Sequence, residues 1–489
     1  MFSIRLVENR RKLEATFADC HDLVVLPWRF GNRMQYEALS VYFETLTDRQ
    51  DHNFMRETLR SLVGNDMGSD TELEPRQIIS YFEQHGADQK QGIVIRRMDD
   101  AISELLQGNV IVLIEGWANA IKYEDKSVEG RSVDEPVSES VVKGPREGTV
   151  ENLQTNIGML RSRLQSPKFK IRKVPTGGET KTAVIYGYVE DAVPKQTLAI
   201  FTKRIAAAAN KEILETSYIE ELIEDSTYSP FPQYRYTERT DTAVASLLEG
   251  KIVVLVQGTG IILICPGLFP EFFQSSEDYY ERTVISSFIR QLRIVAFFIA
   301  LTLPSIYIAL STFHPELIPT VLLLAVLNTR EGIPFPSLVE AIIMLFFFEL
   351  LREAGIRLPK PVGSAVSIVG ALIIGEAAIN AGIASPIMVV IVALTGIASF
   401  SIPQYSIAIS LRLLQLPLMI MTAILGIFGA MIGLLWVIIH LSSLQSLGQP
   451  YLSPLAPLRI GQLRDTLLRA PLKRILNTPR RAHNRKYLD

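Results

Sequence analysis

The sequence predicts an α/β soluble N-terminal region made of two related subdomains, followed by an all-α polytopic membrane domain. Three observations support this prediction. The long apolar runs lie almost entirely after Arg293, a segment of the first half is repeated, and a block of cations ends the chain. With 489 residues, the chain has room for two or three domains.

We expect the chain to divide into five parts. Residues 1–125 form the first α/β subdomain, 126–150 a linker, and 151–273 the second subdomain. Residues 274–457 form a multi-pass transmembrane domain, and 458–489 a basic cytoplasmic tail. The linker is assigned from its acidic, serine-bearing and weakly apolar composition, which is typical of an exposed connector.

An internal repeat defines the two subdomains. Residues 101–121, AISELLQGNVIVLIEGWANAI, align without gaps to residues 243–263, AVASLLEGKIVVLVQGTGIIL. Each copy predicts an amphipathic helix, a glycine stop and a β-branched strand. Two further strands and a helix are expected before each copy, at 22–28, 39–46 and 53–63 in the first and at 169–174, 183–189 and 194–209 in the second.

The soluble half carries no convincing catalytic set. The sequence lacks GxSxG, HExxH, Walker and paired CxxC patterns, and Cys20 and Cys265 have no metal-ligand spacing. We therefore expect no enzyme activity, no catalytic residue, no metal site and no cofactor. The GPREG turn around Arg146 has two interpretations, an anion-binding turn or a tight connector docking onto the second subdomain. The connector is favoured because no phosphate-loop spacing is present.

The second half contains five apolar segments of membrane length, at 294–310, 336–351, 362–382, 386–401 and 413–439. A shorter run at 321–327 predicts a re-entrant or interfacial piece. Before the first span, 274–293 opens with a cap-like Ser275 three residues before Asp278. We expect that segment to stay helical into the membrane.

Charge predicts the orientation. The chain begins without a cleavable signal pattern, and Arg290, Arg293 and the cationic tail after 458 favour a cytoplasmic location for both termini. Five crossings would put the tail outside, so one segment must not cross. We expect four crossings, with 386–401 and 402–416 forming a re-entrant hairpin or interfacial helix because Pro403 and Arg412 interrupt the apolar pattern. Six crossings is the alternative.

The stretch 361–382, PVGSAVSIVGALIIGEAAINAG, contains one ionisable residue, Glu376. Stepping about 100° per residue separates it into two faces, with Gly370 on neither. One face is a helix-packing stripe of small residues, Gly363, Ser367, Ala371 and Gly375, joined by Ala378 and Gly382. The other face is a candidate pore-lining or gate face formed by Val362, Val366, Val369, Ile373, Glu376 and Asn380. A purely structural alternative is that Glu376 pairs with an arginine or caps a neighbouring helix.

Several stretches carry a resemblance to a known family. They are VVKGPREGTVENLQTNIGMLRSRL, SSEDYYERTVISSFIRQLRI, FHPELIPT, REGIPFP, ELLREAGIRLPKPVGSAVSIVGALIIGEAAINAGIASP and LGQPYLSPLAP, which cover most of the chain after Val141. In these residues the chain resembles the A subunit of the GerA-type spore germinant receptors of endospore-forming bacteria. Members of that family often carry an acid in the segment matching 343–348, where this chain has IMLFFF.

The resemblance implies a nutrient germinant receptor subunit in the spore inner membrane. It implies a permease-like B subunit and a lipoprotein C subunit as partners, and an oligomer, proposed to be a pentamer, that conducts monovalent cations to start spore germination. Membrane lipid is an expected partner and nucleic acid is not. Two alternatives stay open: a non-conducting scaffold that transmits the B subunit's state, and a secondary transporter.

Overall fold

The computed structural model describes residues 1–30, 35–47, 75, 79–80, 92–124, 135–136, 138–359, 370, 373–459 and 463–473. They divide into two compact units. The sheet unit contains Met1–Ile223 and Tyr236–Pro266, and the helical unit contains Glu224–Arg235 and Gly267–Asn477. The expected helix at 53–63 lies outside the described residues.

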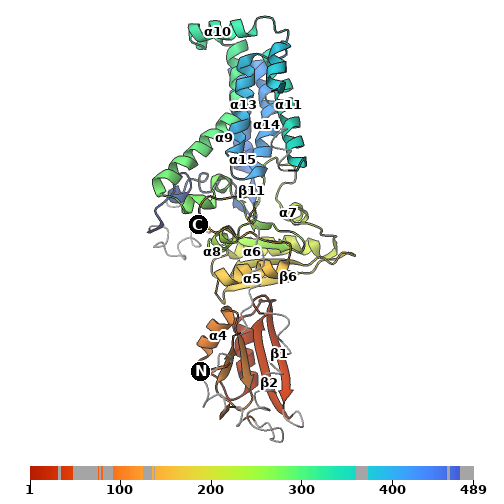
Figure 1. Cartoon of the computed structure of the whole chain (residues 1–489), viewed down its shortest axis with the longest axis vertical. Helices are drawn as coiled ribbons and strands as arrows, with labels where there is room; N and C mark the ends of the chain where they lie inside the picture. The colour runs from red at the N-terminus through yellow and green to blue at the C-terminus, as the bar shows by residue number, and fades with distance from the viewer. Residues whose placement is uncertain are drawn as a thin grey trace. The chain divides into compact units, whose positions relative to one another are not determined.

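The first lobe of the sheet unit is built on a five-stranded sheet (Figure 1). Its strands are β1 (Leu23–Phe30), β2 (Tyr36–Phe43), β3 (Ile93–Ile95), β4 (Val110–Ile114) and β5 (Ala120–Tyr123), in the order β1-β2-β4-β5-β3. All four pairings are antiparallel. Helices α1 (Leu6–Thr16) and α4 (Met98–Leu106) share a buried core with this sheet.

The second lobe repeats the same strand order, β6-β7-β9-β10-β8. Its strands are β6 (Phe169–Val174), β7 (Val184–Val189), β8 (Arg235–Thr237), β9 (Ile252–Val256) and β10 (Ile262–Cys265). Its helices are α5 (Leu153–Arg163), α6 (Lys195–Ile205), α7 (Thr216–Ile223) and α8 (Thr240–Leu248), with a short 3-10 helix at Ala206–Asn210. The sequence repeat therefore lies on α4-β4-β5 in one lobe and on α8-β9-β10 in the other.

Glycines at matching positions end these elements. Gly108 and Gly250 follow α4 and α8 with φ of 92° and 88°, and Gly116 and Gly258 follow β4 and β9 with φ of 87° and 88°. A side chain strains such a backbone conformation. At Gly250 an added Cβ would also lie 2.3 Å from the Ala192 carbonyl oxygen. The predicted glycine stops are confirmed.

The duplication extends to a helix that sequence comparison missed. In α1, Asn9 bonds both the N–H and the carbonyl of Ser3, and in α5, Asn156 does the same with Val150. Each helix start is also held by a residue at the end of a central strand. Glu115 accepts from the Leu6 N–H and Gln257 from the Leu153 N–H, so the two lobes share tertiary contacts as well as strand order.

A buried ion pair joins the two lobes. Arg161 on α5 is 1% exposed and binds Asp22 with a two-pronged contact, in which Nη2 lies 2.6 Å from Oδ1. The guanidinium carbon also lies 4.2 Å from the ring centre of Phe43 and 5.3 Å from that of Phe169. Beside it, burial raises the pKa of the Cys20 thiol, and the Arg161 charge opposes that shift.

The GPREG segment docks on the second lobe. Gly148 forms an isolated bridge with Arg239, which also donates to the Pro145 carbonyl at 2.8 Å. Arg146 forms an exposed ion pair with Glu135 at 3.0 Å. These are the contacts expected if GPREG is a tight connector that docks onto the second subdomain.

The helical unit contains six labelled α-helices (Figure 1). They are α9 (Thr283–Thr312), α10 (Thr320–Arg330), α11 (Ser337–Arg357), α13 (Pro386–Phe400), α14 (Tyr405–Leu425) and α15 (Ile427–Ser443). Short 3-10 helices lie at Phe269–Phe273, Ser276–Tyr279, Pro315–Leu317 and Leu463–Asp465, and β11 (Gln445–Ser446) pairs with β12 (Gln449–Pro450).

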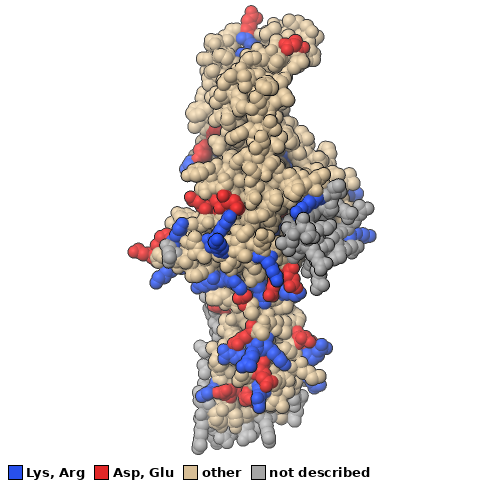
Figure 2. Space-filling model, turned by 180° about the vertical axis from the view of Figure 1, so that it is seen from behind, with Lys and Arg blue, Asp and Glu red and all other residues tan. Residues whose placement is uncertain are grey.

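Among the described residues, two helices are long and apolar enough to cross a membrane, α9 with 30 residues and α14 with 21. The apolar helices α10, α13 and α15 are shorter. Figure 2 shows one face of the molecule, on which charged side chains are dense over the sheet unit and sparse over the helices.

Two sequence expectations in this unit are wrong. The run 413–439 is two helices and not one, because Gly426 takes φ 61° and ψ −143° and ends α14 before α15 begins. The segment 274–293 is not one continuous helix either. The predicted capping pair of Ser275 and Asp278 is present but starts a 3-10 turn, and α9 begins at Thr283.

The two residues that interrupt the apolar pattern at 386–416 lie in different structures. Pro403 lies in the turn between α13 and α14, whereas Arg412 lies within unbroken helix α14. The short run 321–327 lies within α10.

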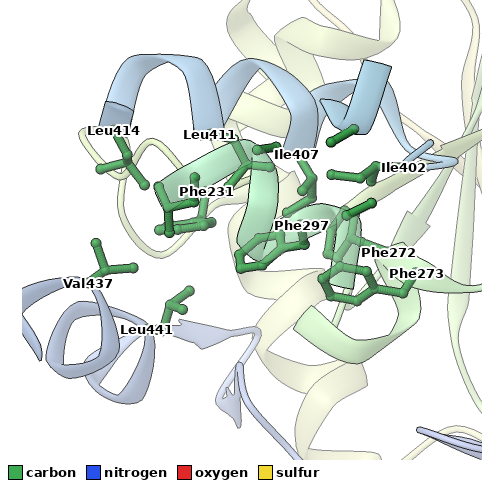
Figure 3. Close-up of a cluster of buried hydrophobic side chains, with 14 of the residues drawn as sticks. Phe231, Phe272, Phe273, Phe297, Ile402, Ile407, Leu411, Leu414, Val437 and Leu441 are labelled. Atoms are coloured by element: carbon green, nitrogen blue, oxygen red, sulfur yellow. The ribbon is translucent and has the colours of Figure 1, made fainter. Parts of the chain in front are cut away.

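An aromatic core lies where helices α9, α14 and α15 meet the non-helical segments of this unit (Figure 3). Phe297 from α9 packs at 5.3 Å, ring to ring, from Phe273, and Ile407 and Leu441 join the same cluster. Tyr451 is fully buried there, donates to the Pro232 carbonyl at 2.6 Å, and has its pKa raised by burial.

Buried charges hold the start of α9 to the C-terminal segment. Arg290 is completely buried, 3.3 Å from Asp278 and 3.4 Å from Asp465. Arg293 also binds Asp278, at 2.8 Å. Arg469 then donates to the Thr283 hydroxyl at 2.7 Å. Residues 463–473 of the expected tail are therefore held against the start of α9.

Candidate functional site

The candidate pore helix is described only in part. Residue 370 and residues 373–382 belong to the described chain. The predicted gate residues Val362, Val366 and Val369 lie outside the described residues, as do the stripe residues Gly363, Ser367 and Ala371.

The last turns of this helix have two different faces. Gly375 and Ala378 are buried, and a Cβ added at Gly375 would lie 3.6 Å from a methyl group of Val389 on α13. Ile373, Glu376 and Asn380 are exposed in the single chain, Ile373 by 58%. The structure thus brings the described stripe residues against a neighbouring helix and leaves the described pore-face residues uncovered.

The helix ends at Gly382. Its φ is 66°, and the Ile383 N–H bonds back to the Ala378 carbonyl at 2.9 Å, as in a glycine-capped helix end. Gly370, expected on neither face, in fact faces α11, because an added Cβ would lie 2.6 Å from Leu351 Cδ2.

Glu376 carries its carboxylate on the uncovered face. Within the part of the chain that the structure describes, no lysine, arginine or histidine lies within ion-pair distance of it.

Glu340 is a second intrahelical acid, and it is fully buried. One of its carboxylate oxygens accepts from the Ser385 N–H at 3.0 Å, and the other lies 3.0 Å from Arg330. Arg330 also donates to Ser337. The cluster ties α10, the start of α11 and the cap of α13 together immediately after the candidate pore helix. Sequence reasoning missed it, although an arginine and a glutamate on either side of a proline-rich turn were a usable signal.

The helices alternate in direction between two ends. At the loop end, Ser311 of α9 meets Ser337 of α11, Ser385 meets Glu340, and Gly426 lies against Phe313. The opposite end of the bundle, called the foot end below, contains the start of α9, the contact of Arg352 with Tyr405, and the chain after α15. Because 373–382 ends near the Gly332 carbonyl, this segment also runs toward the loop end.

This architecture defines a class of protein in which a duplicated α/β sheet unit precedes an apolar helical bundle with membrane-length helices. The chain belongs to the Bacillus/Clostridium GerA spore germination protein family, which it matches over residues 11–481. The resemblance inferred from sequence is confirmed.

Individual relatives match along nearly the whole chain. It is 40% identical over 472 residues to the uncharacterized membrane protein YfkQ of Bacillus subtilis strain 168, covering 96% of this chain and 90% of that protein. It is 39% identical over 471 residues to spore germination protein KA of the same organism, covering 96% and 85%. Among solved structures, it is similar to the N-terminal domain of the A subunit of the Bacillus megaterium spore germinant receptor GerK3. That match has 24% identity and a TM-score of 0.42 and covers 55% of this chain and 97% of that one.

Proposed function

We propose that this chain is the A subunit of a nutrient germinant receptor in the spore inner membrane and that it forms an oligomeric, pentameric cation channel whose opening starts germination. Membership of the spore germination family and the membrane-length helices support the receptor role. The observation that carries the channel role is the two-faced end of the candidate pore helix, with Glu376 and Asn380 uncovered opposite a packed small-residue face.

In this proposal, copies of the 362–382 helix surround an axis. Val362, Val366, Val369 and Ile373 form apolar rings that close the path by dewetting. Glu376 and Asn380 form polar rings that attract cations, and Gly363, Ser367, Ala371 and Gly375 pack against the subunit's own helices. The permease-like B subunit and the lipoprotein C subunit are its proposed partners, and nutrient binding is communicated to the gate through them.

The experiment is conductance of the purified oligomer in planar bilayers. We expect potassium current that falls several-fold in Glu376→Gln without loss of assembly. Glu353→Gln is the matched control, because Glu353 forms an exposed pair with Arg357 on α11. An intact oligomer without current would favour the scaffold role instead.

We propose six crossings in place of four, with both termini in the cytoplasm. The alternating directions of α9, α11, 373–382, α13, α14 and α15 support six, and the break at Gly426 removes the single last span on which four crossings depended. A cysteine at Ser401, in the turn after α13, distinguishes the two. With both native cysteines replaced, six crossings predict labelling from the same side as cysteines at Ser127 and Asn484. Labelling from the opposite side would contradict six crossings.

A further inference from the structure

Four polar side chains gather at the foot end of the helical unit, where the last turns of α11 meet the start of α14. Glu349 binds Arg352 at 2.7 Å and lies 3.2 Å from the Nε of Arg412. Both guanidinium carbons lie near the ring centre of Tyr405, Arg352 at 5.8 Å and Arg412 at 5.9 Å. Two cations face one carboxylate, so the cluster carries one net positive charge.

The guanidinium of Arg412 is buried without a hydrogen-bond acceptor. Its Nε, Nη1 and Nη2 are all shielded from solvent, and none has a hydrogen-bond partner among the described residues. The contact with Glu349 is an ion pair of poor hydrogen-bond geometry. A guanidinium offers five N–H donors, and burying them unpaired is strongly unfavourable. The Glu349 carboxylate therefore faces the charge of Arg412 but leaves its N–H donors without a well-oriented acceptor.

The start of α14 adds donors of the same kind. Among the described residues, the hydroxyl of Ser406 is also buried without a hydrogen-bond partner. The first N–H groups of a helix have no intrahelical acceptor and favour an anion. An arginine fork, a hydroxyl and a helix start are together the donor set that a phosphate group fits.

The surroundings of the cluster are apolar. Ile409 and Leu413 on α14 are 47% and 61% exposed, Phe400 at the end of α13 is 60% exposed, and Tyr405 is 51% exposed. An aromatic ring at the end of an apolar helix is typical of the membrane interface. An anionic phospholipid presents both a phosphate and acyl chains, whereas free phosphate presents the first alone.

We propose that Arg412, with Arg352 and Ser406, binds a phosphate group, and that its source is the headgroup of an anionic phospholipid. The proposal uses the membrane location of the proposed function but not ion conduction, so a non-conducting protein with this site would leave it standing.

The test is thermal unfolding of the purified full chain in uncharged detergent, with phosphatidylglycerol, phosphatidylcholine or inorganic phosphate added. We expect phosphatidylglycerol to raise the unfolding midpoint more than phosphatidylcholine. The half-saturating concentration should increase about tenfold in Arg412→Gln, the loss of one charge-assisted contact worth about 1.4 kcal/mol. Arg357→Gln is the matched control, since Arg357 is 77% exposed on the same helix end and should respond like the native protein.

A shift with inorganic phosphate that Arg412→Gln abolishes would support the site and assign it to free phosphate. Equal responses of the native protein and Arg412→Gln to phosphatidylglycerol would overturn the proposal. If Arg412→Gln does not fold, Arg412→Met, which removes the charge and keeps an apolar side chain of similar length, takes its place. Native protein that responds equally to all three additives contradicts the proposal without any variant.

Discussion

The sheet unit and the helical unit differ in how evenly their charged side chains are matched. In the sheet unit, Arg161 and Asp22 are both buried, Nε and Nη2 of Arg161 bind the Asp22 carboxylate, and the pair joins two copies of one fold. In the helical unit the matching is uneven. Glu340 is buried and paired with Arg330, whereas Glu376 is uncovered and has no cation within ion-pair distance in the described chain. The difference teaches that a matched interior charge supports architecture, whereas an uncovered carboxylate on an apolar helix, such as that of Glu376, is a candidate contact for an ion or another subunit.

The largest expected effect is at the matched pair of the sheet unit. Arg161→Ala leaves the Asp22 carboxylate buried without its cation and with the Thr45 hydroxyl, which donates to it at 3.1 Å, still in place. The loss should destabilise the sheet unit by about 3–5 kcal/mol. Denaturant unfolding of the full chain, followed by tyrosine and tryptophan fluorescence, measures the change. Arg163→Ala, two residues further along α5 in a half-exposed pair with Glu147, should cost less than about 1 kcal/mol. Equal losses in the two variants would mean that the buried pair is not the joint between the lobes.

The second effect separates the two acids of the helical unit. Glu340→Gln removes the charge that Arg330 faces and keeps an acceptor for the Ser385 N–H. It should therefore lower the free energy of unfolding by about 1.5–3 kcal/mol. The yield of folded protein and its thermal midpoint should both fall. Glu376→Gln should leave both unchanged and lower conductance. A Glu376→Gln variant as unstable as Glu340→Gln would show that Glu376 has a structural partner.

The third effect compares the two faces of the candidate pore helix. Val366→Ala should wet the apolar constriction, so spores should lose cations or germinate without nutrient while the receptor still assembles. Ser367→Leu, Ala371→Leu and Gly375→Leu, on the packing face, should lower the amount of assembled receptor, and at Gly375 the reason is its approach to Val389. Dormant, responsive Val366→Ala spores together with a leaking Ser367→Leu receptor would assign the pore to the other face.

The smallest effect concerns the two thiols. Burial raises the pKa of both Cys20 and Cys265, and Cys265 is completely buried whereas Cys20 is partly exposed. A raised pKa keeps the thiol protonated at neutral pH, so Cys20 should label slowly and faster as the pH rises. Cys265 should label after unfolding. Labelling rates with a maleimide reagent between pH 7 and 9 measure the reactivity of both thiols. Rapid labelling of Cys265 in the native protein would contradict its burial in the second lobe.

Short-range pattern was enough to predict much of this protein. The repeat, the glycine stops at Gly108 and Gly250 and the strands at 169–174 and 183–189 were visible because side-chain periodicity and glycine φ are local properties. The cap at Ser275 and the turn at Pro403 were visible for the same reason. The family resemblance was carried by contiguous motifs.

Tertiary structure alone decided what depends on partners distant in sequence. Asp22 and Arg161 are 139 positions apart, and Glu340 and Ser385 are 45 apart, so no local period predicts that they meet. The break at Gly426 was hidden because 413–439 is apolar throughout, and a hydropathy pattern is the same for one long helix and for two. Helices α14 and α15 turn back on each other at Gly426 because they pack through small residues. Gly429 lies against the Met421 carbonyl and Gly433 against Leu418, where a side chain would not fit.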